Sequence, residues 1–169
     1  LLRHYGITQI NFDLIYGLPA QTRESVTSTI EKVIQLAPET IAFYSYAHLP
    51  SKIKNQKLIQ DSDLPTPTEK LNLYLIGKKL LKENGYRDIG MDHFASAGSY
   101  LLENKITRNF MGYTNKKSDF LIGLGITSIG SSPNFFVQNS KDLNEYYDLV
   151  LANKLPIING HKLSPEEIK

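Results

Sequence analysis

Asn11-Phe-Asp-Leu-Ile-Tyr-Gly-Leu-Pro19 is the stretch that decides the fold, because it places one carboxylate, that of Asp13, in the middle of an otherwise apolar strand. The strand then stops sharply at Gly17-Leu-Pro19. A central strand normally excludes aspartate, since burying an ionised carboxylate without partners costs several kcal/mol. Asp13 is therefore either paired within the fold or turned toward a binding site.

Side chains alternate between the two faces of a strand, so the even and odd positions of this stretch separate. The even-numbered face is apolar and suits packing under a helix, while the other face carries the carboxylate. Near a strand end, Asp13 can accept hydrogen bonds from a ligand's hydroxyl pair or ammonium group. Satisfaction of Asp13 by neighbouring backbone N–H groups remains the alternative. The even face holds Ile10, Phe12, Leu14 and Tyr16, and the odd face holds Asn11, Asp13 and Ile15.

Strand and helix signals alternate outward from this stretch. Strands separated by helices of this length indicate βαβ units, so we predict an α/β fold with a parallel sheet, open or curled into part of a barrel. In such sheets the functional residues lie at the carboxyl ends of the strands. The predicted strands span 8–16, 40–46 and 87–91, the predicted helices span 23–36, 67–84 and 141–153, a further apolar stretch covers 119–129, and residues 94–118 have no regular pattern.

Composition excludes several classes of protein. The chain has 169 residues, of which 41% are hydrophobic and 21% charged, which is enough for a domain with a real core. Its 19 basic and 17 acidic residues are scattered, so no nucleic-acid partner is indicated. No apolar run approaches the roughly 20 residues of a membrane helix, and no signal peptide is visible. We expect a cytoplasmic protein with no membrane partner.

The chain contains no cysteine, which removes disulfides, thiolate nucleophiles and cysteine-ligated iron–sulfur clusters from this stretch of sequence. Its four histidines show no i, i+4 pairing of the kind that ligates metals. The sequence therefore predicts no metal site within the chain.

Both ends of the chain have the pattern of interrupted helices. Residues 1–5 suit the last turn of a helix closed by Gly6, where a left-handed residue is expected. Near the other end, Ser164-Pro-Glu-Glu167 suits the opening of a helix. We therefore expect this chain to be a piece of a larger protein.

Three further stretches hold candidate functional residues. His93 follows the strand at 87–91 and can serve as an acid, a base or an anion ligand, or be merely hydrogen-bonded. Arg108 lies in an irregular segment and can clamp a carboxylate, or be solvated. Ala47 follows the strand at 40–46, where its small side chain lets a flat ring approach the backbone, or simply ends the strand. The glycines of residues 123–130 lack the spacing of a phosphate-binding loop and more simply allow close backbone approach.

Five motifs taken together are similar to those of one enzyme family, the oxygen-independent coproporphyrinogen III oxidases, in order over essentially the whole chain. These are radical S-adenosylmethionine enzymes of haem biosynthesis. The motifs are Asn11-Phe-Asp-Leu-Ile-Tyr-Gly-Leu-Pro19, Tyr46-Ala-His-Leu-Pro50, Ile89-Gly-Met-Asp-His-Phe-Ala95, Arg108-Asn-Phe-Met-Gly-Tyr-Thr114 and Gly123-Leu-Gly-Ile-Thr-Ser-Ile129.

The resemblance implies a fold and a reaction. The fold is a curved, open, parallel α/β barrel of the radical S-adenosylmethionine type, with its later strands in residues 1–130 and the start of the C-terminal region in 131–169. In the reaction, a 5'-deoxyadenosyl radical abstracts hydrogen from a propionate of coproporphyrinogen III, which loses carbon dioxide to become vinyl, twice per substrate. The product is protoporphyrinogen IX. Residues 94–107 are a few positions shorter than the family pattern.

The resemblance also implies cofactors, partners and site residues. Asp13 and Ala47 correspond to contacts with one bound S-adenosylmethionine, and Ile129 corresponds to an apolar contact with a second. The cysteines that ligate the family's [4Fe-4S] cluster lie upstream of the matched stretch, so we expect the chain alone to be inactive. Arg108 and His93 are our own candidates for binding the substrate propionates. The expected partners are the missing N-terminal part, coproporphyrinogen III and an electron donor, in an enzyme that is a monomer when full length.

Two other functions remain as alternatives. The first is a non-catalytic haem-binding or trafficking module, because a paralogue with that role shares the first motif. The second is a self-sufficient phosphate-binding α/β barrel enzyme, which needs more strands than this length allows and an anion site that the sequence does not show.

Overall fold

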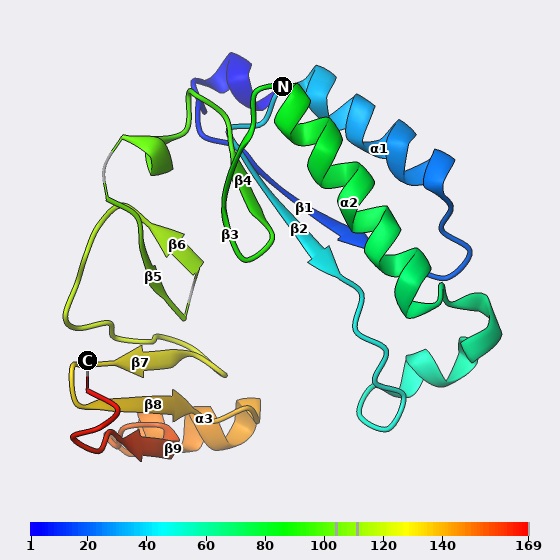
Figure 1. The fold of residues 1–169 in the computed structure, drawn as a ribbon. Coiled ribbons are helices and arrows are strands. Elements are labelled where there is room, and N and C mark those ends of the chain that lie inside the picture. The colour runs from blue at the N-terminus through cyan, green and yellow to red at the C-terminus, as the bar shows by residue number, and fades with distance from the viewer. Residues whose placement is uncertain (104, 111, 169) are drawn as a thin grey trace. The chain divides into compact units, whose positions relative to one another are not determined.

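A computed structural model describes residues 1–103, 105–110 and 112–168 of the chain. These residues form two compact units, an N-terminal unit of Leu1–Lys105 and a C-terminal unit of Ile106–Lys169 (Figure 1). Each unit has its own sheets, and each is described separately below.

The N-terminal unit is a four-stranded sheet with two long helices. The strands follow the order β1-β2-β4-β3, in which β1 and β2 are parallel and β4 runs antiparallel to both β2 and β3. The strands are β1 (Asn11–Tyr16), β2 (Thr40–Ser45), β3 (Arg87–Gly90) and β4 (His93–Ala95), the helices are α1 (Arg23–Leu36) and α2 (Pro67–Glu83), and four 3-10 turns are η1 (Leu2–Tyr5), η2 (Lys54–Leu58), η3 (Asp61–Asp63) and η4 (Tyr100–Leu102).

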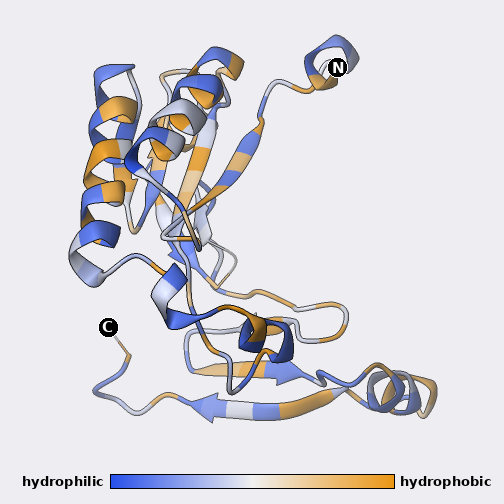
Figure 2. Ribbon diagram, turned by 90° about the vertical axis from the view of Figure 1, so that its right-hand side faces the viewer, coloured by the Kyte–Doolittle hydropathy of each residue, from blue (hydrophilic) through white to orange (hydrophobic). Residues whose placement is uncertain are grey.

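The core of this unit lies between one face of the sheet and the two helices. Exposure alternates along β1, with the odd positions exposed and the even positions partly or fully buried. This confirms the predicted period of two, and Phe12 and Leu14 pack against the core. Figure 2 shows apolar turns on both helices and apolar segments on the strands. The buried core comprises Tyr16, Val26, Ile30, Val33, Ile41, Phe43, Leu73, Leu81, Tyr86 and Phe94.

The two long helices begin where the sequence predicts, α1 also ends there, and α2 ends one residue earlier than predicted. Thr22 caps α1, and its hydroxyl accepts from the backbone N–H of Ser25 while the Ser25 hydroxyl accepts from that of Thr22. Thr66 and Glu69 form the same reciprocal pair at the start of α2, where Pro67 occupies the first helical position. These caps satisfy backbone N–H groups that a helix start leaves without partners.

The prediction of an all-parallel sheet is wrong at the third position. The chain leaves α2 into β3, which has the direction of β2 but does not pair with it. A tight turn at Met91 and Asp92, both with left-handed φ (42° and 68°), sends the chain back as β4, which occupies the place beside β2. His93 therefore begins β4 instead of ending β3. The unit is a mixed α/β structure.

The C-terminal unit is built from antiparallel strands and one helix. The hairpin β5 (Thr107–Asn109) and β6 (Gly112–Thr114) falls in the stretch predicted to be irregular. A meander follows, of β7 (Ile129–Ser131), β8 (Phe135–Asn139) and β9 (Ile157–Lys162). Helix α3 (Leu143–Leu151) confirms the predicted helix and is two residues shorter at each end. The apolar stretch 119–129 is not a continuous strand, since Leu121 makes only an isolated bridge with Ser131.

The chain ends also bear on the predictions. Leu2–Tyr5 is a 3-10 turn closed by Gly6 at a left-handed φ of 79°. Ser164 and Glu167 form a reciprocal pair of hydrogen bonds, in which the Ser164 N–H donates to the Glu167 carboxylate and the Glu167 N–H donates to the Ser164 carbonyl. Within the described part of the chain, no helix has the length and apolar character needed to cross a membrane.

Candidate functional site

The face of the N-terminal sheet opposite the two helices carries the predicted polar residues. We call it the open face. Asp13 on β1 lies beside Ala42 on β2, and Ala42 lies beside His93 on β4. Because neighbouring strands are about 4.8 Å apart, Asp13 and His93 stand roughly 10 Å apart across the small side chain of Ala42. The open face consists of Asn11, Asp13, Ile15, Thr40, Ala42, Tyr44, His93 and Ala95.

Asp13 is exposed on this face, and two neutral side chains orient it. The Asn11 amide Nδ2 donates to Asp13 Oδ1 over 2.7 Å. The Thr40 hydroxyl in turn donates to Asn11 Oδ1 over 2.9 Å. Sequence reasoning placed Asn11 on the correct face but missed its role. The signal that could have revealed it is an amide residue, Asn11, two positions before an acidic one, Asp13, because residues i and i+2 of a strand share one face.

His93 is held in one orientation by its own turn. Its Nδ1 lies 2.8 Å from the backbone carbonyl of Met91, which can only accept, so Nδ1 carries a proton. In the neutral ring, Nε2 is then an acceptor and lies 3.5 Å from the Tyr44 hydroxyl. The two rings meet edge to face at 5.7 Å. His93 thus presents a defined face of its ring beside Tyr44.

Ala47 is exposed and lies two residues beyond β2, in a segment fixed by polar contacts. The Tyr46 N–H donates to the Tyr16 carbonyl over 2.8 Å, which continues the pairing of β1 and β2. The Lys70 ammonium donates to the Tyr46 carbonyl over 2.5 Å. Lys70 crosses directly above Gly17, where an added Cβ would lie 2.6 Å from its Cε. A left-handed Gly17 with no side chain is what admits this lysine.

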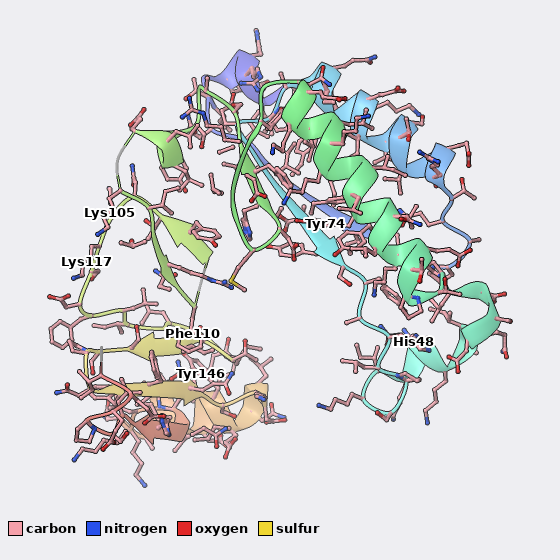
Figure 3. The ribbon with its side chains drawn as sticks, viewed as in Figure 1. His48, Tyr74, Lys105, Phe110, Lys117 and Tyr146 are labelled. Atoms are coloured by element: carbon pink, nitrogen blue, oxygen red, sulfur yellow. The ribbon has the colours of Figure 1, made fainter. Side chains whose placement is uncertain are left out.

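Gln56 clamps the same segment from the following loop. Its Nε2 donates to the Ala47 carbonyl over 3.0 Å, and its Oε1 accepts from the Leu49 N–H over 2.5 Å. His48, between them, places Nδ1 3.3 Å from the Tyr46 hydroxyl and Nε2 3.5 Å from Asp61 (Figure 3). The long loop between β2 and α2 is thus tied back to the end of β2 by side chains that the sequence did not single out.

Arg108 lies on β5 of the C-terminal unit, opposite Tyr113 on β6. Its guanidinium stands 5.6 Å from the centroid of the Tyr113 ring. Phe110 packs edge to face on Phe136 of β8, with ring centroids 4.8 Å apart (Figure 3). This contact holds the hairpin against the meander, and Arg108 remains exposed.

Ile129 is the first residue of β7 and lies against the glycine-rich segment. A Cβ at Gly123 would come within 2.9 Å of the Ile129 carbonyl group, so the glycine permits the close backbone approach that the sequence suggested. The Asn139 amide donates to the Gly123 carbonyl over 3.1 Å and to the Gly125 carbonyl over 2.9 Å. The Gly125 N–H donates to the Tyr146 hydroxyl over 3.2 Å. Asn139 is buried and was not predicted.

An apolar cavity of about 610 Å³ lies within the C-terminal unit, between this segment, the meander and the end of α3. The residues that line it include Leu121, Ile122, Val137, Val150 and Ile157. A second cavity, of about 750 Å³, lies in the N-terminal unit between the turn before α1 and the first half of α2. It is on the helical side of the sheet, away from Asp13.

The structure therefore brings together only some of the predicted site residues. Asp13 and His93 share the open face, and Ala47 follows the carboxyl end of the neighbouring strand. Arg108 and Ile129 belong to the other unit. Among the residues described, no group of three or more histidines and carboxylates could hold a metal ion.

Comparisons with known proteins identify relatives over nearly the whole chain. The chain is 43% identical to the oxygen-independent coproporphyrinogen III oxidase of Helicobacter pylori J99 over 172 residues, which cover 99% of this chain and 38% of the relative. It is 41% identical to the enzyme of the same name from Escherichia coli K12 over 152 residues, which cover 88% and 33%. No protein-family model matches.

A solved structure shares the fold. It is described as coproporphyrinogen III oxidase (HemN) from Escherichia coli, a radical SAM enzyme, and it matches with a TM-score of 0.90 and 38% identity. The match covers 98% of this chain and 39% of the solved chain. This chain therefore spans less than two-fifths of the length of the relatives it matches.

Proposed function

We propose that this chain, which is homologous to the oxygen-independent coproporphyrinogen III oxidases over about 38% of their length, supplies part of such an enzyme. The observation that carries the proposal is the match to the solved enzyme, because it combines a TM-score of 0.90 with 38% identity over 98% of the chain. A shared fold alone supports many functions, whereas identity at this level along the whole chain supports a shared site.

The proposed reaction of the complete enzyme converts two propionate side chains of coproporphyrinogen III to vinyl groups. Each propionate loses a hydrogen atom, carbon dioxide and one electron, and the electron passes to an acceptor. S-adenosylmethionine, bound beside a reduced iron–sulfur cluster, supplies the radical that removes the hydrogen atom. We also propose a cytoplasmic enzyme that works as a monomer with an electron donor.

The chemistry of the open face suits S-adenosylmethionine. Asp13 is an exposed carboxylate oriented by neutral groups, so it can accept from an ammonium or from ribose hydroxyls. Ala47 offers no bulk beyond Cβ and its backbone is clamped on both sides, which allows an adenine ring to lie against it. Ile129, fixed by the glycine segment, would provide an apolar contact to a second molecule of the same ligand.

The iron–sulfur cluster does not fit this chain. Such clusters need cysteine thiolates, and the sequence has none. We therefore propose that the cluster ligands come from another part of the enzyme and that this chain supplies only part of the cofactor site.

His93 and Arg108 are proposed to receive the substrate carboxylates. A propionate needs cations or donors, and Arg108 presents an exposed guanidinium on a hairpin. The Nδ1 of His93 is held by the Met91 carbonyl, so Nε2, on the side of Tyr44, is the ring nitrogen that would meet a carboxylate.

The parallel β1–β2 pair is consistent with a segment of a curved, open α/β barrel. We propose that residues 1–130 form its later part and that residues 131–169 begin the C-terminal region. In the complete enzyme, the carboxyl ends of β1 and β2 would face the cofactor.

Exchange of Asp13→Asn in the full-length protein tests the proposal. We expect the KM for S-adenosylmethionine in 5'-deoxyadenosine formation to rise about 10-fold or more, because a charge-assisted hydrogen bond is lost. The thermal unfolding midpoint should stay within a few degrees of the wild type. If the variant instead unfolds readily and the fraction that stays folded binds S-adenosylmethionine normally, Asp13 has a structural role.

Vinyl formation from coproporphyrinogen III by the same preparation tests the reaction itself. A protein that binds haem but forms no vinyl group under reducing conditions with S-adenosylmethionine would overturn the enzymatic proposal in favour of a haem carrier.

A further inference from the structure

We propose that Asn11 and Thr40 are positioning residues that orient the Asp13 carboxylate toward its ligand. This inference rests on the proposed function, in which Asp13 binds S-adenosylmethionine. Both residues lie on the open face beside Asp13, and the hydrogen bonds that they make are to other residues of this chain.

The direction of each hydrogen bond follows from chemistry alone. An ionised carboxylate can only accept, so the atom of Asn11 at 2.7 Å from Asp13 Oδ1 must be the amide nitrogen. The amide oxygen of Asn11 then faces Thr40, whose hydroxyl at 2.9 Å must donate. These two hydrogen bonds, which we call the relay, therefore run in one direction only, from Thr40 through Asn11 to Asp13. They end on a single carboxylate oxygen.

Backbone pairing fixes the first two members of this relay. Asn11 and Thr40 lie side by side in the parallel ladder. The Thr40 N–H donates to the Ile10 carbonyl over 3.2 Å, which locks the register at this point. Thr40 is only 8% exposed, so water competes little for its hydroxyl. A preorganised donor of this kind holds its partner at less entropic cost than a flexible one.

The relay leaves both the charge and one oxygen of Asp13 for a ligand. Among the described residues, none of the ion pairs includes Asp13, so its charge is not neutralised within the N-terminal unit. A neutral amide donates a hydrogen bond to the carboxylate without cancelling its charge. With Oδ1 accepting from Asn11, Oδ2 is the oxygen that would bind a ligand with an ammonium group or adjacent hydroxyls.

Three variants of the full-length protein test the relay. Thr40→Val keeps the shape of the side chain and removes the donor, Thr40→Ser restores a donor, and Asn11→Leu removes the bridging amide. We expect Thr40→Val to raise the KM for S-adenosylmethionine about 3- to 10-fold and Asn11→Leu to raise it at least as much, with kcat changed less. Thr40→Ser should return the KM to within about 2-fold of wild type. Thr29→Val, which removes a similar hydroxyl at an exposed position of α1, is the matched control and should leave KM unchanged.

A double-mutant cycle separates this inference from the proposed function. In the Asp13→Asn background, Thr40→Val should have little further effect on KM, because the relay acts only through the carboxylate. If Asp13→Asn weakens binding while Thr40→Val and Asn11→Leu do not, the relay is overturned and the proposed function stands. The relay is also overturned if Thr40→Val has the same effect on KM with and without Asp13. If Asp13→Asn itself leaves KM unchanged, the assignment of Asp13 fails first.

Discussion

Gly77 on α2 shows how closely single residues set the packing of this fold. A Cβ at this position would come within 2.8 Å of Phe43 Cζ, and still closer to Cε1. Phe43 is 2% exposed and packs between Tyr16 and Tyr74, with ring centroids at 4.8 and 6.2 Å, so it has little room to move. The absence of a side chain at Gly77 makes room for the Phe43 ring of β2 against α2.

Exchange of Gly77→Ala should therefore destabilise the chain despite the higher helix propensity of alanine. We expect the free energy of unfolding to fall by about 1–3 kcal/mol, as for other overpacked cores. Urea unfolding followed by circular dichroism measures this. Gly98→Ala is the control, because a Cβ there meets no atom within 4 Å. Equal stability of both variants would contradict the packing argument.

The ion pair of Lys78 and Asp88 predicts that the stability of the fold depends on pH. Lys78 Nζ donates to Asp88 Oδ2 over 2.7 Å, which lowers the pKa of the Asp88 carboxyl below its ordinary value. The folded state then binds fewer protons than the unfolded state at this group. Its stabilisation is present at neutral pH and is lost as the pH falls through the pKa of the folded state. The pair is partly exposed, so the contribution is less than about 1 kcal/mol.

Asp88→Asn should flatten the fall in stability between neutral pH and about pH 3, measured by urea unfolding at each pH. The hydrogen bond with Asp88 raises the pKa of Lys78, so Lys78 stays charged throughout that range and the pH dependence comes from Asp88. Asp119→Asn, which removes an exposed aspartate outside the ion pairs of the described residues, should leave the profile unchanged. A profile altered equally by both variants would exclude the pair as its cause.

Residue-level prediction succeeded where it depended on local periodicity. Alternation alone placed Asp13 on the face away from the helices, and the predicted helix starts at residues 23 and 67 are confirmed. The partners of Asp13 were harder to predict, because Thr40 reaches Asn11 only through a register that spans 29 residues of sequence. Gln56 and Asn139 were missed for the same reason, since an isolated amide carries no periodic signal.

At the scale of elements, the antiparallel strand β4 is the clearest departure from the sequence prediction. Hairpins of this kind are normally signalled by Asn-Gly or Asp-Gly. Here the two left-handed positions are Met91 and Asp92, so the usual signal is absent. The strands β4 to β7 have only three residues each, too short for an alternating pattern to be recognised. The bounds of α1 were predicted without error, and those of β1, β2 and α2 within three residues.

The loop between β2 and α2 is the element where one side chain should control mobility. Gln56→Glu keeps the acceptor for the Leu49 N–H but replaces the donor to the Ala47 carbonyl with a second oxygen. We expect limited trypsin digestion of the loop to become about 3- to 10-fold faster, with little change in global stability. Mass spectrometry would identify the cleavage sites, which are expected at Lys52, Lys54 and Lys57.

Gln60→Glu is the matched control for this experiment. It makes the same chemical change four residues further along the loop, at an exposed residue whose side chain does not cap η3. Equal digestion of the two variants would show that the clamp does not order the loop.

At the scale of the whole molecule, the proposed cofactor residues are divided between two compact units. Asp13 and Ala47 lie in one and Ile129 lies in the other. All three are proposed from motifs that are local in the sequence, and no sequence pattern reports how two units are arranged. The barrel expected from the resemblance likewise depends on strands beyond the four of the N-terminal sheet.

The isolated chain should not initiate radical chemistry, because it has no cysteine to hold a cluster. With dithionite and S-adenosylmethionine, we expect no 5'-deoxyadenosine above the level of a protein-free control, measured by liquid chromatography. The full-length protein with a reconstituted cluster is the positive control. Turnover by the chain alone would refute the proposed division of the site.

The two edge strands of the N-terminal sheet differ in how readily another strand could pair with them. The β3 edge is short, carries Arg87 and Asp88, and has an irregular register between Asp88 and Gly90, all of which discourage another strand from joining. The β1 edge is six residues long and regular, and within the described residues it pairs on one side only. The carbonyls of Ile10 and Tyr16 accept from the β2 side, so the backbone groups of the odd positions between them point outward. The β3 edge thus disfavours a further strand and the β1 edge favours one, and a strand that pairs with β1 would lie next to Asp13.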